Sequence, residues 1–224
     1  MEHAFQIGSL VLYKNNQLIA FNKPAGLPVQ DDKTGDKALI RLGEIYAQCK
    51  LHPIHRLDRP ASGIALFAKN PGAMASVSEQ FRSRDVEKVY LAVVGQKPEV
   101  EEGMLRHYVA KNARLNRSVA LDEEKPGAQL AELSYRYLRS IDRYHLLEVR
   151  LLSGRHHQIR AQLAAIGCPI KGDVKYGFRR GNPDRSIHLH AWKLRFRHPV
   201  SGEWEAITAP VPAGDPVWNA FEID

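Results

Sequence analysis

The sequence predicts an α+β protein with a central mixed, mostly antiparallel sheet and flanking helices. Short apolar runs typical of strands alternate with apolar residues at helical spacing, without the regular strand-helix-strand repeat of a parallel sheet. At 224 residues and 44% hydrophobic composition, the chain is long enough to bury a sizeable core. Because no linker, repeat or low-complexity tract is present, we expect a single domain over residues 1–224.

The first part of the chain predicts a hairpin followed by a helix. Apolar runs at 10–13 and 18–21 flank Lys14-Asn15-Asn16-Gln17, which favours a turn. Asp36 is expected to cap the helix. The apolar stripe expected to face the core consists of Leu39, Leu42, Ile45, Tyr46 and Cys49.

The middle of the chain predicts strands at 64–68 and 88–94 with a helix between them. Asn70-Pro71 is typical of a capped helix start, and Met74, Val77 and Phe81 continue its apolar period. Segment 97–127 is polar and charge-mixed, so only short strands are expected there.

Further strands are predicted at 129–138, 144–152 and 188–196. Between the last two, Ser153–Arg160 opens a helix that ends at Gly167. His156 and Arg160 are four residues apart and are expected on one side of this helix. Ser201-Gly202 favours the turn of a final hairpin.

Charge and cysteine content narrow the class of protein. The formal net charge of +7 favours an acidic partner, and nucleic acid is the commonest one. Two cysteines make neither a disulfide framework nor a zinc ligand set. No apolar stretch approaches the roughly 18 residues of a spanning helix, and no basic segment with an apolar core opens the chain. A cytoplasmic location is therefore expected.

The strongest candidate site is His55-Arg-Leu-Asp-Arg-Pro-Ala-Ser-Gly63, where Asp58 lies between Arg56 and Arg59. Such a cluster is often only a loop salt bridge. Here a strand follows at once and would present the loop at the rim of a sheet, where catalytic residues are frequent. A carboxylate beside guanidinium groups stays ionised, which suits a nucleophile or base at a sugar carbon and not a general acid.

Other candidate site residues have weaker support in the sequence. His156-His157 lacks the spacing of zinc ligands, so no metal site is expected, and the pair His188 and His190 on one strand face is interpreted as packing or surface. Lys23, before Pro24-Ala-Gly26, is either a surface charge or a phosphate contact; the surface charge is the favoured interpretation.

Several separated motifs together carry a resemblance to a known family. They are Lys23-Pro-Ala-Gly26, His55-Arg-Leu-Asp58 with Ser62-Gly63, Lys88-Val-Tyr90, Gly154-Arg-His-His-Gln-Ile-Arg160 and Gly172-Asp173. In this order they resemble the signature series of the RluA family of pseudouridine synthases. The resemblance covers most of the chain and implies the pseudouridine synthase-like fold, with an active-site cleft.

The resemblance also implies roles for five residues. Asp58 matches the essential aspartate that acts on the ribose of the target uridine in RNA. Tyr90 matches the tyrosine that stacks on the target base, and Arg160 the basic residue that ion-pairs with the aspartate. Arg56 matches the arginine that enters the RNA stack in place of the flipped uridine, and Arg155 is expected to contact the RNA backbone.

The expected protein is thus an RNA-modifying isomerase that acts on rRNA or tRNA, with no cofactor and no metal, as a monomer. Ala61 stands where a threonine is usual, which touches no expected catalytic group. The first strand is expected too close to Met1 for a separate S4 RNA-binding domain. Two alternatives are a catalytically silent RNA-binding module of the same fold and a hydrolase. The hydrolase would need a second carboxylate as acid, for which no motif is present.

Overall fold

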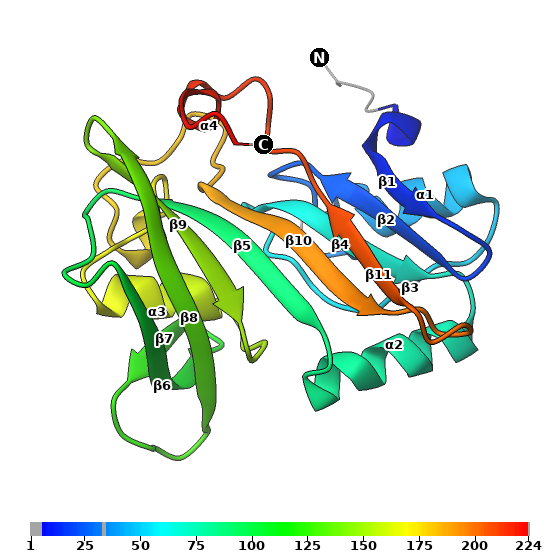
Figure 1. The fold of residues 1–224 in the computed structure, drawn as a ribbon, viewed down its shortest axis with the longest axis horizontal. Helices are drawn as coiled ribbons and strands as arrows, with labels where there is room; N and C mark the ends of the chain where they lie inside the picture. Colours follow the sequence, from blue (N-terminus) through cyan, green and yellow to red (C-terminus); the bar gives the residue numbers. More distant parts are fainter. Residues whose placement is uncertain (1–5, 33–34, 224) are drawn as a thin grey trace. The chain divides into compact units, whose positions relative to one another are not determined.

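The computed structural model describes residues 6–32 and 35–223. Helices and antiparallel strand pairs alternate along these ranges, which confirms the predicted α+β class. The chain divides into two compact units, each built from two stretches of sequence (Figure 1). The first contains the residues before Glu87 and Ala191–Pro212; the second contains Glu87–His190 and the residues from Ala213 on. The single domain expected from the sequence stays a prediction.

The first unit is built on a short sheet. Its strand order is β1 (Val11–Lys14), β2 (Leu18–Lys23), β4 (Ser62–Ala68) and β10 (Leu189–Arg197, in this unit from Ala191 on), with β3 (His52–Pro53) paired to β4 and β11 (Trp204–Thr208) paired to β10. The predicted turn between β1 and β2 is present, because the Asn15 side-chain oxygen accepts hydrogen bonds from the backbone amides of Gln17 and Leu18 at 2.8 and 2.7 Å.

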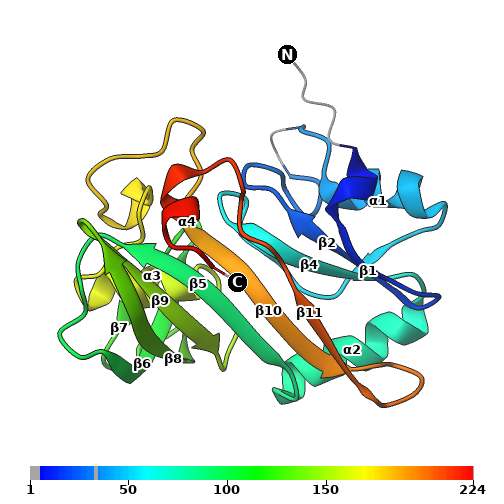
Figure 2. The ribbon, with the colours of Figure 1, turned by 45° about the horizontal axis from the view of Figure 1, so that its top comes forward.

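Strand β4 forms the centre of this unit. Every residue of β4 is buried, and the rings of Phe67 and of Phe21 in β2 meet edge to face at 5.9 Å. The helix α2 (Pro71–Ser83) packs against β3 and β4. Figure 2 shows α2 beside the strands of this unit. It begins as predicted, since the Asn70 side chain accepts a hydrogen bond from the Ala73 amide at 2.8 Å. This buried strand gives the preceding loop a rigid support.

The helix α1 (Leu39–Ala47) differs from its prediction in cap and buried face. No side chain caps its start, and Asp36 instead forms an ion pair with Arg59. Ile45 is 67% exposed, and the buried face contains Gly43. A methyl group at Gly43 would lie 2.8 Å from the Leu51 side chain. The helix is therefore rotated so that its smallest residue lies against the core.

The second unit is an antiparallel sheet that contains the longest strands of the described chain. Its order is β5 (Glu87–Val94), β9 (Tyr144–Leu151), β8 (Ala128–Ile141), β6 (Glu102–Asn112) and β7 (Arg117–Leu121). Segment 97–127, where only short strands were expected, contains the long strand β6. Short elements complete the chain: η1 (Ile7–Leu10) in the first unit, and η2 (Val174–Tyr176) and α4 (Pro216–Ala220) in the second.

The helix α3 (Gln158–Ala165) packs on β6 and β7 of the second unit. Its residues from Gln158 to Leu163 are all buried, although three of them are polar. Gln158 illustrates how they are accommodated, because its amide nitrogen donates to the Glu132 carbonyl at 3.0 Å and its amide oxygen accepts from the Ser153 hydroxyl at 2.8 Å. The helix begins only after His157, which has a left-handed backbone with φ of 51°. His156 thus precedes the helix, and the prediction that it shares a helical side with Arg160 is wrong.

Candidate active site

Asp58 lies in the loop between β3 and β4 of the first unit. The preceding Leu57 is buried and anchors the loop, whereas Asp58 is half-buried and Arg56 is exposed. The Asp58 carbonyl accepts a hydrogen bond from the Ala61 amide at 3.0 Å, which closes a tight turn through Arg59-Pro60. The turn leads directly into the buried strand β4. The carboxylate is therefore carried on a short loop that is held at both ends.

Gly63 fixes the far end of this loop. Its φ is +109°, and a methyl group at this position would lie 2.3 Å from the carbonyl oxygen of Ala191. No side chain fits such an approach of two backbones. The Ser62-Gly63 pair in the sequence motif therefore has a local structural reason.

Arg59 ties the loop to the turn that follows β2. Its Nε donates to the Gly26 carbonyl at 2.8 Å, and the Gly26 amide donates to the Arg59 carbonyl at 2.8 Å. The guanidinium also forms ion pairs with Asp32, at 3.2 Å, and with Asp36. Arg59 thus joins the Asp58 loop to the connection between β2 and α1. That Arg59 and Arg56 hold Asp58 ionised stays a prediction.

Lys23 contacts the backbone of the Asp58 loop from the buried side, and its exposure was predicted wrongly from the sequence. Its side chain is fully buried, and Nζ lies within hydrogen-bonding distance of four carbonyl oxygens: Pro24 (3.0 Å), Leu27 (3.0 Å), Arg59 (3.2 Å) and Ala61 (2.6 Å). The surface charge favoured from the sequence is therefore wrong. The carbonyls of Arg59 and Ala61 belong to the turn that begins at Asp58, so the Lys23 side chain supports this turn from the inside of the protein.

Burial and two neighbouring charges set the protonation of Lys23. Burial lowers the pKa of its amine to about 7; the charge of Asp58 raises this pKa, and the charge of Arg59 lowers it. A sequence signal for its burial does exist. Lys23 continues the alternate positions of Ile19 and Phe21, which both face the core.

Tyr90 and Arg160, the other two expected catalytic residues, belong to the second unit. Tyr90 is in β5 opposite Val149 and is 8% exposed. Val89 lies opposite Arg150 on the other face of the sheet, as the predicted alternation requires. Tyr90 is therefore a largely buried residue on the same sheet face as Val149.

Arg160 is fixed by an acidic partner that was not predicted. Its guanidinium forms two hydrogen bonds to the Asp173 carboxylate, at 2.6 and 2.9 Å, and both side chains are almost fully buried. The Tyr176 ring lies 4.9 Å from the guanidinium carbon. Gly172-Asp173 stands out in the sequence as a motif, but nothing there indicates which residue Asp173 pairs with. The expected pairing of Arg160 with Asp58 stays a prediction.

The segment before α3 is held by side-chain hydrogen bonds. Arg155 donates through Nε to the Leu130 carbonyl at 3.1 Å. His156 is hydrogen-bonded to the Ser118 hydroxyl at 2.8 Å, and His157 to the Tyr176 hydroxyl at 3.0 Å. The two histidines therefore have hydroxyl partners within the second unit.

His188 and His190 are packing residues. His188 is fully buried, stacks on Trp218 at 5.3 Å and lies 3.1 Å from the Asp215 carboxylate. Burial lowers the pKa of His188, with Lys171 acting in the same direction and Asp215 against it. His190 is also buried and meets the Trp218 ring edge to face. In the described part of the chain no cluster of three or more His, Cys, Asp or Glu side chains could bind a metal ion.

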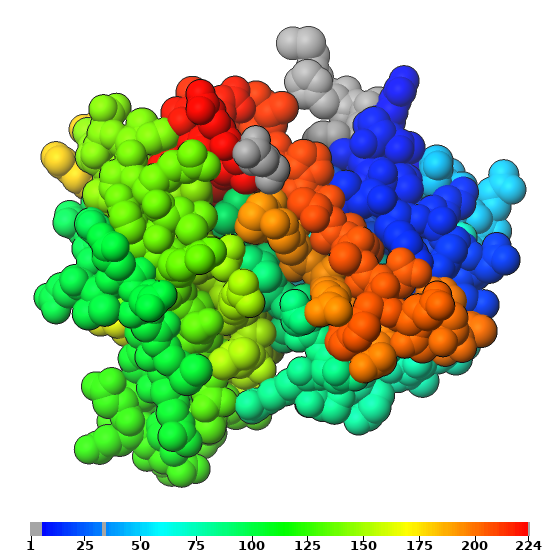
Figure 3. Space-filling view, viewed as in Figure 1, coloured from blue at the N-terminus to red at the C-terminus, as the bar shows by residue number. Residues whose placement is uncertain are grey.

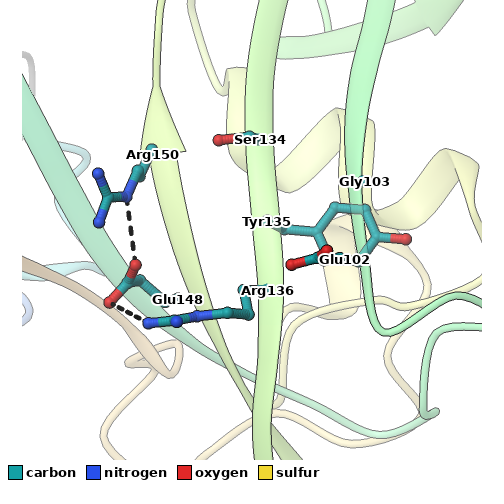
Figure 4. A pocket seen from close by; sticks show the side chains of 7 residues that line it. All are labelled: Glu102, Gly103, Ser134, Tyr135, Arg136, Glu148 and Arg150. Carbon is teal, nitrogen blue, oxygen red and sulfur yellow. Dashed lines mark hydrogen bonds and ion pairs between the residues drawn. The ribbon is translucent and has the colours of Figure 1, made fainter.

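A hollow of about 450 Å³ lies over β6, β8 and β9 in the second unit (Figure 4). In it Arg136 and Arg150 approach the same carboxylate, Glu148, at 3.6 and 3.3 Å. Glu148 lies opposite Leu91 in the register, so the charged side of the hollow is on the sheet face opposite to Tyr90. None of the five expected site residues lines this hollow.

Comparison with known proteins identifies the class. The model of the RNA pseudouridylate synthase family matches residues 17–165. The dual-specificity RNA pseudouridine synthase RluA of Pasteurella multocida is 32% identical over 89% of this chain and 92% of its own length. The tRNA pseudouridine synthase C of Haemophilus ducreyi is 35% identical over 89% of each chain. An uncharacterized RNA pseudouridine synthase of Chloroflexus aurantiacus is 38% identical, and the match spans 86% of this chain and 62% of that protein.

Solved structures agree on the fold. Human RNA pseudouridylate synthase domain containing 4 superposes with a TM-score of 0.76 at 24% identity, over 93% of this chain and 90% of that chain. Human RNA pseudouridylate synthase domain containing 1 superposes with a TM-score of 0.75 at 25% identity, over 94% of this chain and 86% of that chain.

The chain therefore belongs to the RNA pseudouridylate synthase family, and the resemblance to RluA enzymes is confirmed. Members of this class are isomerases that convert uridine in RNA to pseudouridine. Within the described ranges, no helix is long and apolar enough to cross a membrane.

Proposed function

We propose that this protein isomerises one specific uridine of ribosomal or transfer RNA and that Asp58 is its catalytic carboxylate. The relatives that support this substrate class carry names for both kinds of RNA: RluA of Pasteurella multocida is called a dual-specificity enzyme, and ribosomal large subunit pseudouridine synthase C of Rickettsia conorii is 33% identical. The location is proposed to be cytoplasmic and the protein a monomer that uses no metal.

The reaction needs few groups, because it rearranges one nucleotide without a co-reactant. The bond from ribose C1′ to N1 of uracil breaks, the base turns, and C1′ bonds to C5. The proton on C5 leaves and N1 gains one, so atoms and charge balance. An ionised carboxylate acts on the ribose as nucleophile or base while the first bond breaks.

Each remaining site residue has a proposed role. Tyr90 stacks on the target uracil, and Arg160 holds the catalytic carboxylate in place. Arg56, which is exposed on the catalytic loop, occupies the RNA stack after the uridine has flipped out. Arg155 contacts the RNA backbone.

One observation carries the proposal: the support of the Asp58 loop. A buried ammonium, a buried leucine, a tight turn and a glycine that admits no side chain hold this loop, and Arg59 ties it to its neighbours. A surface salt bridge needs no such support, because exposed ion pairs contribute little to stability. A catalytic carboxylate does need it, since misplacement of about 1 Å can cost about 100-fold in rate.

The test is pseudouridine mapping by carbodiimide-adduct reverse-transcription stops. Total RNA from cells of the source organism lacking the gene is compared after complementation with wild type, Asp58→Asn or Asp122→Asn. Asp122 is 97% exposed and lies outside the proposed site, so its variant controls for loss of a carboxylate. Wild type and the control should restore a site that Asp58→Asn leaves unmodified.

The alternative is the silent RNA-binding module. If deletion removes no pseudouridine and the purified protein still binds RNA, this alternative replaces the proposal. If Asp58→Asn restores modification at a rate near wild type, Asp58 is not the catalytic carboxylate.

A further inference from the structure

The hairpin of β10 and β11 in the first unit presents a row of cations to solvent. Lys193, Arg195 and Arg197 alternate along β10 with the buried Leu194 and Phe196, so the three cations share the outer face. At a rise of about 3.3 Å per residue the row spans about 13 Å. In Figure 3 the atoms of this hairpin, drawn in orange, lie uncovered on the face in view.

Each of these cations lies close to a tryptophan ring. Trp204 of β11 pairs with Arg197 in the register and is 38% exposed. The guanidinium carbons of Arg195 and Arg197 lie 4.3 and 4.4 Å from its ring centroid. At the other end of the row, Lys193 Nζ lies 3.5 Å from the ring centroid of Trp192. We call Lys193, Arg195, Arg197 and Trp204 the cationic row.

Asp85 forms an ion pair with the row, and Glu205 lies on the other face of the hairpin. Asp85 lies 3.5 Å from Arg197, in a pair whose side chains are both about half exposed. Glu205 pairs with Phe196 in the register, which puts it on the opposite face, where it acts on Tyr13. The row therefore carries three cations, and the carboxylate of Asp85 partly offsets the charge of Arg197.

The row also has a defined relation to the catalytic loop, because both belong to the first unit. Lys193 follows two residues after Ala191, whose carbonyl approaches Gly63 at the end of the Asp58 loop. The row thus leads along β10 away from the point where β10 meets that loop.

We propose that the cationic row binds RNA outside the catalytic loop, with its cations on successive phosphates and Trp204 against a base. This rests on the proposed function for its substrate class, but it does not depend on the role of Asp58. Cations beside an exposed aromatic ring suit a nucleic-acid strand, because phosphates need positive charge and every base offers a face for stacking. Arginine also stacks on aromatic rings without any ligand, so the test must separate binding from hairpin stability.

The experiment measures binding of a fluorescein-labelled single-stranded RNA of mixed sequence by anisotropy, at salt concentrations from about 50 to 200 mM. The test variant replaces Lys193, Arg195 and Arg197 by glutamine in the full chain. A conservative variant, Arg195→Lys with Arg197→Lys, keeps the charges. A matched control, Arg106→Gln with Arg136→Gln and Arg150→Gln, removes three exposed cations from the second unit.

The glutamine variant should bind at least about tenfold more weakly at about 0.1 M salt. The slope of log K against log salt should fall by about 2, because each phosphate that the protein no longer neutralises lowers the slope by about 0.7. The conservative variant should bind within about threefold of wild type, and the matched control should keep the full slope. Trp204→Ala should weaken binding about tenfold, because the ring no longer stacks on a base. Circular dichroism and melting temperature identify any variant that does not fold.

Equal losses of affinity in the glutamine variant and the matched control would overturn the proposal, since binding would then follow net charge alone. An unchanged slope in a folded glutamine variant would also overturn it. Failure of the proposed function has a different signature, which is normal turnover by Asp58→Asn.

Discussion

Arg160 and Asp173 form a two-point ion pair in which the side chains are 4% and 2% exposed. Loss of one partner would leave the other as a buried, uncompensated charge, which costs about 3–5 kcal/mol. Asp173→Asn should therefore lower the free energy of unfolding by an amount of this order, and lower turnover as well. Urea unfolding and single-turnover isomerisation measure the two effects.

The double variant Arg160→Met with Asp173→Leu separates stability from function. Apolar residues of similar size can replace a buried ion pair at little cost in stability. We expect the double variant to regain most of the stability and none of the activity. Recovered turnover would show that Arg160 has only a structural role.

Because the pKa of Lys23 is lowered in the folded protein, we expect the free energy of unfolding to rise with pH. Burial lowers the pKa of Lys23 in the folded protein to about 7 from 10.5, although Asp58 acts against this shift. Between these pH values the unfolded chain binds more protons than the folded one, so stability rises with pH; below about 7 the cost of burying the charged amine is complete. The unfolding free energy of wild type minus that of Lys23→Met should increase from about pH 7 to about pH 10, by at most about 1.4 kcal/mol per pH unit. A flat difference would contradict the lowered pKa.

Substitution by alanine should destabilise the protein much more at Gly63 than at Gly127, although both glycines have a positive φ. A methyl group at Gly63 would overlap the Ala191 carbonyl, whereas at Gly127, with φ of +80°, it would meet nothing within 4 Å. Gly63→Ala should cost about 3–5 kcal/mol, from backbone strain plus overlap, and Gly127→Ala only about 1–2 kcal/mol. Thermal unfolding of both variants measures the difference. Equal costs would mean that the loop adjusts freely.

Replacement of Arg59 should lower the rate of isomerisation with little loss of RNA affinity. Arg59 joins the Asp58 loop to Gly26, Asp32 and Asp36, so Arg59→Ala should let the catalytic loop move and lower kcat by about 10- to 100-fold. Arg41→Ala is the matched control, because Arg41 pairs with Asp31 on the surface. An affinity loss as large as the rate loss would show that Arg59 binds RNA directly.

Much of the fold followed from local sequence. The hairpin at Asn15 and the helix start at Asn70 were predictable because a residue within three positions makes the deciding hydrogen bond. The first helix was misjudged because its rotation depends on the fit of Gly43 against Leu51, which no periodicity reveals. The long β6 was missed because polar and apolar side chains are mixed along it, and even Met104 is exposed.

The sequence by itself determined the family and the expected site, since several ordered motifs carry the resemblance to RluA enzymes. Only the tertiary structure decided how those motifs are supported. Lys23 meets the carbonyl of Ala61, Gly63 meets the backbone of Ala191, and Arg160 meets Asp173. The partners in these contacts are separated along the chain, and folding alone brings them together. A buried charge is stable only where such partners compensate its lost hydration, so its position depends on the whole fold.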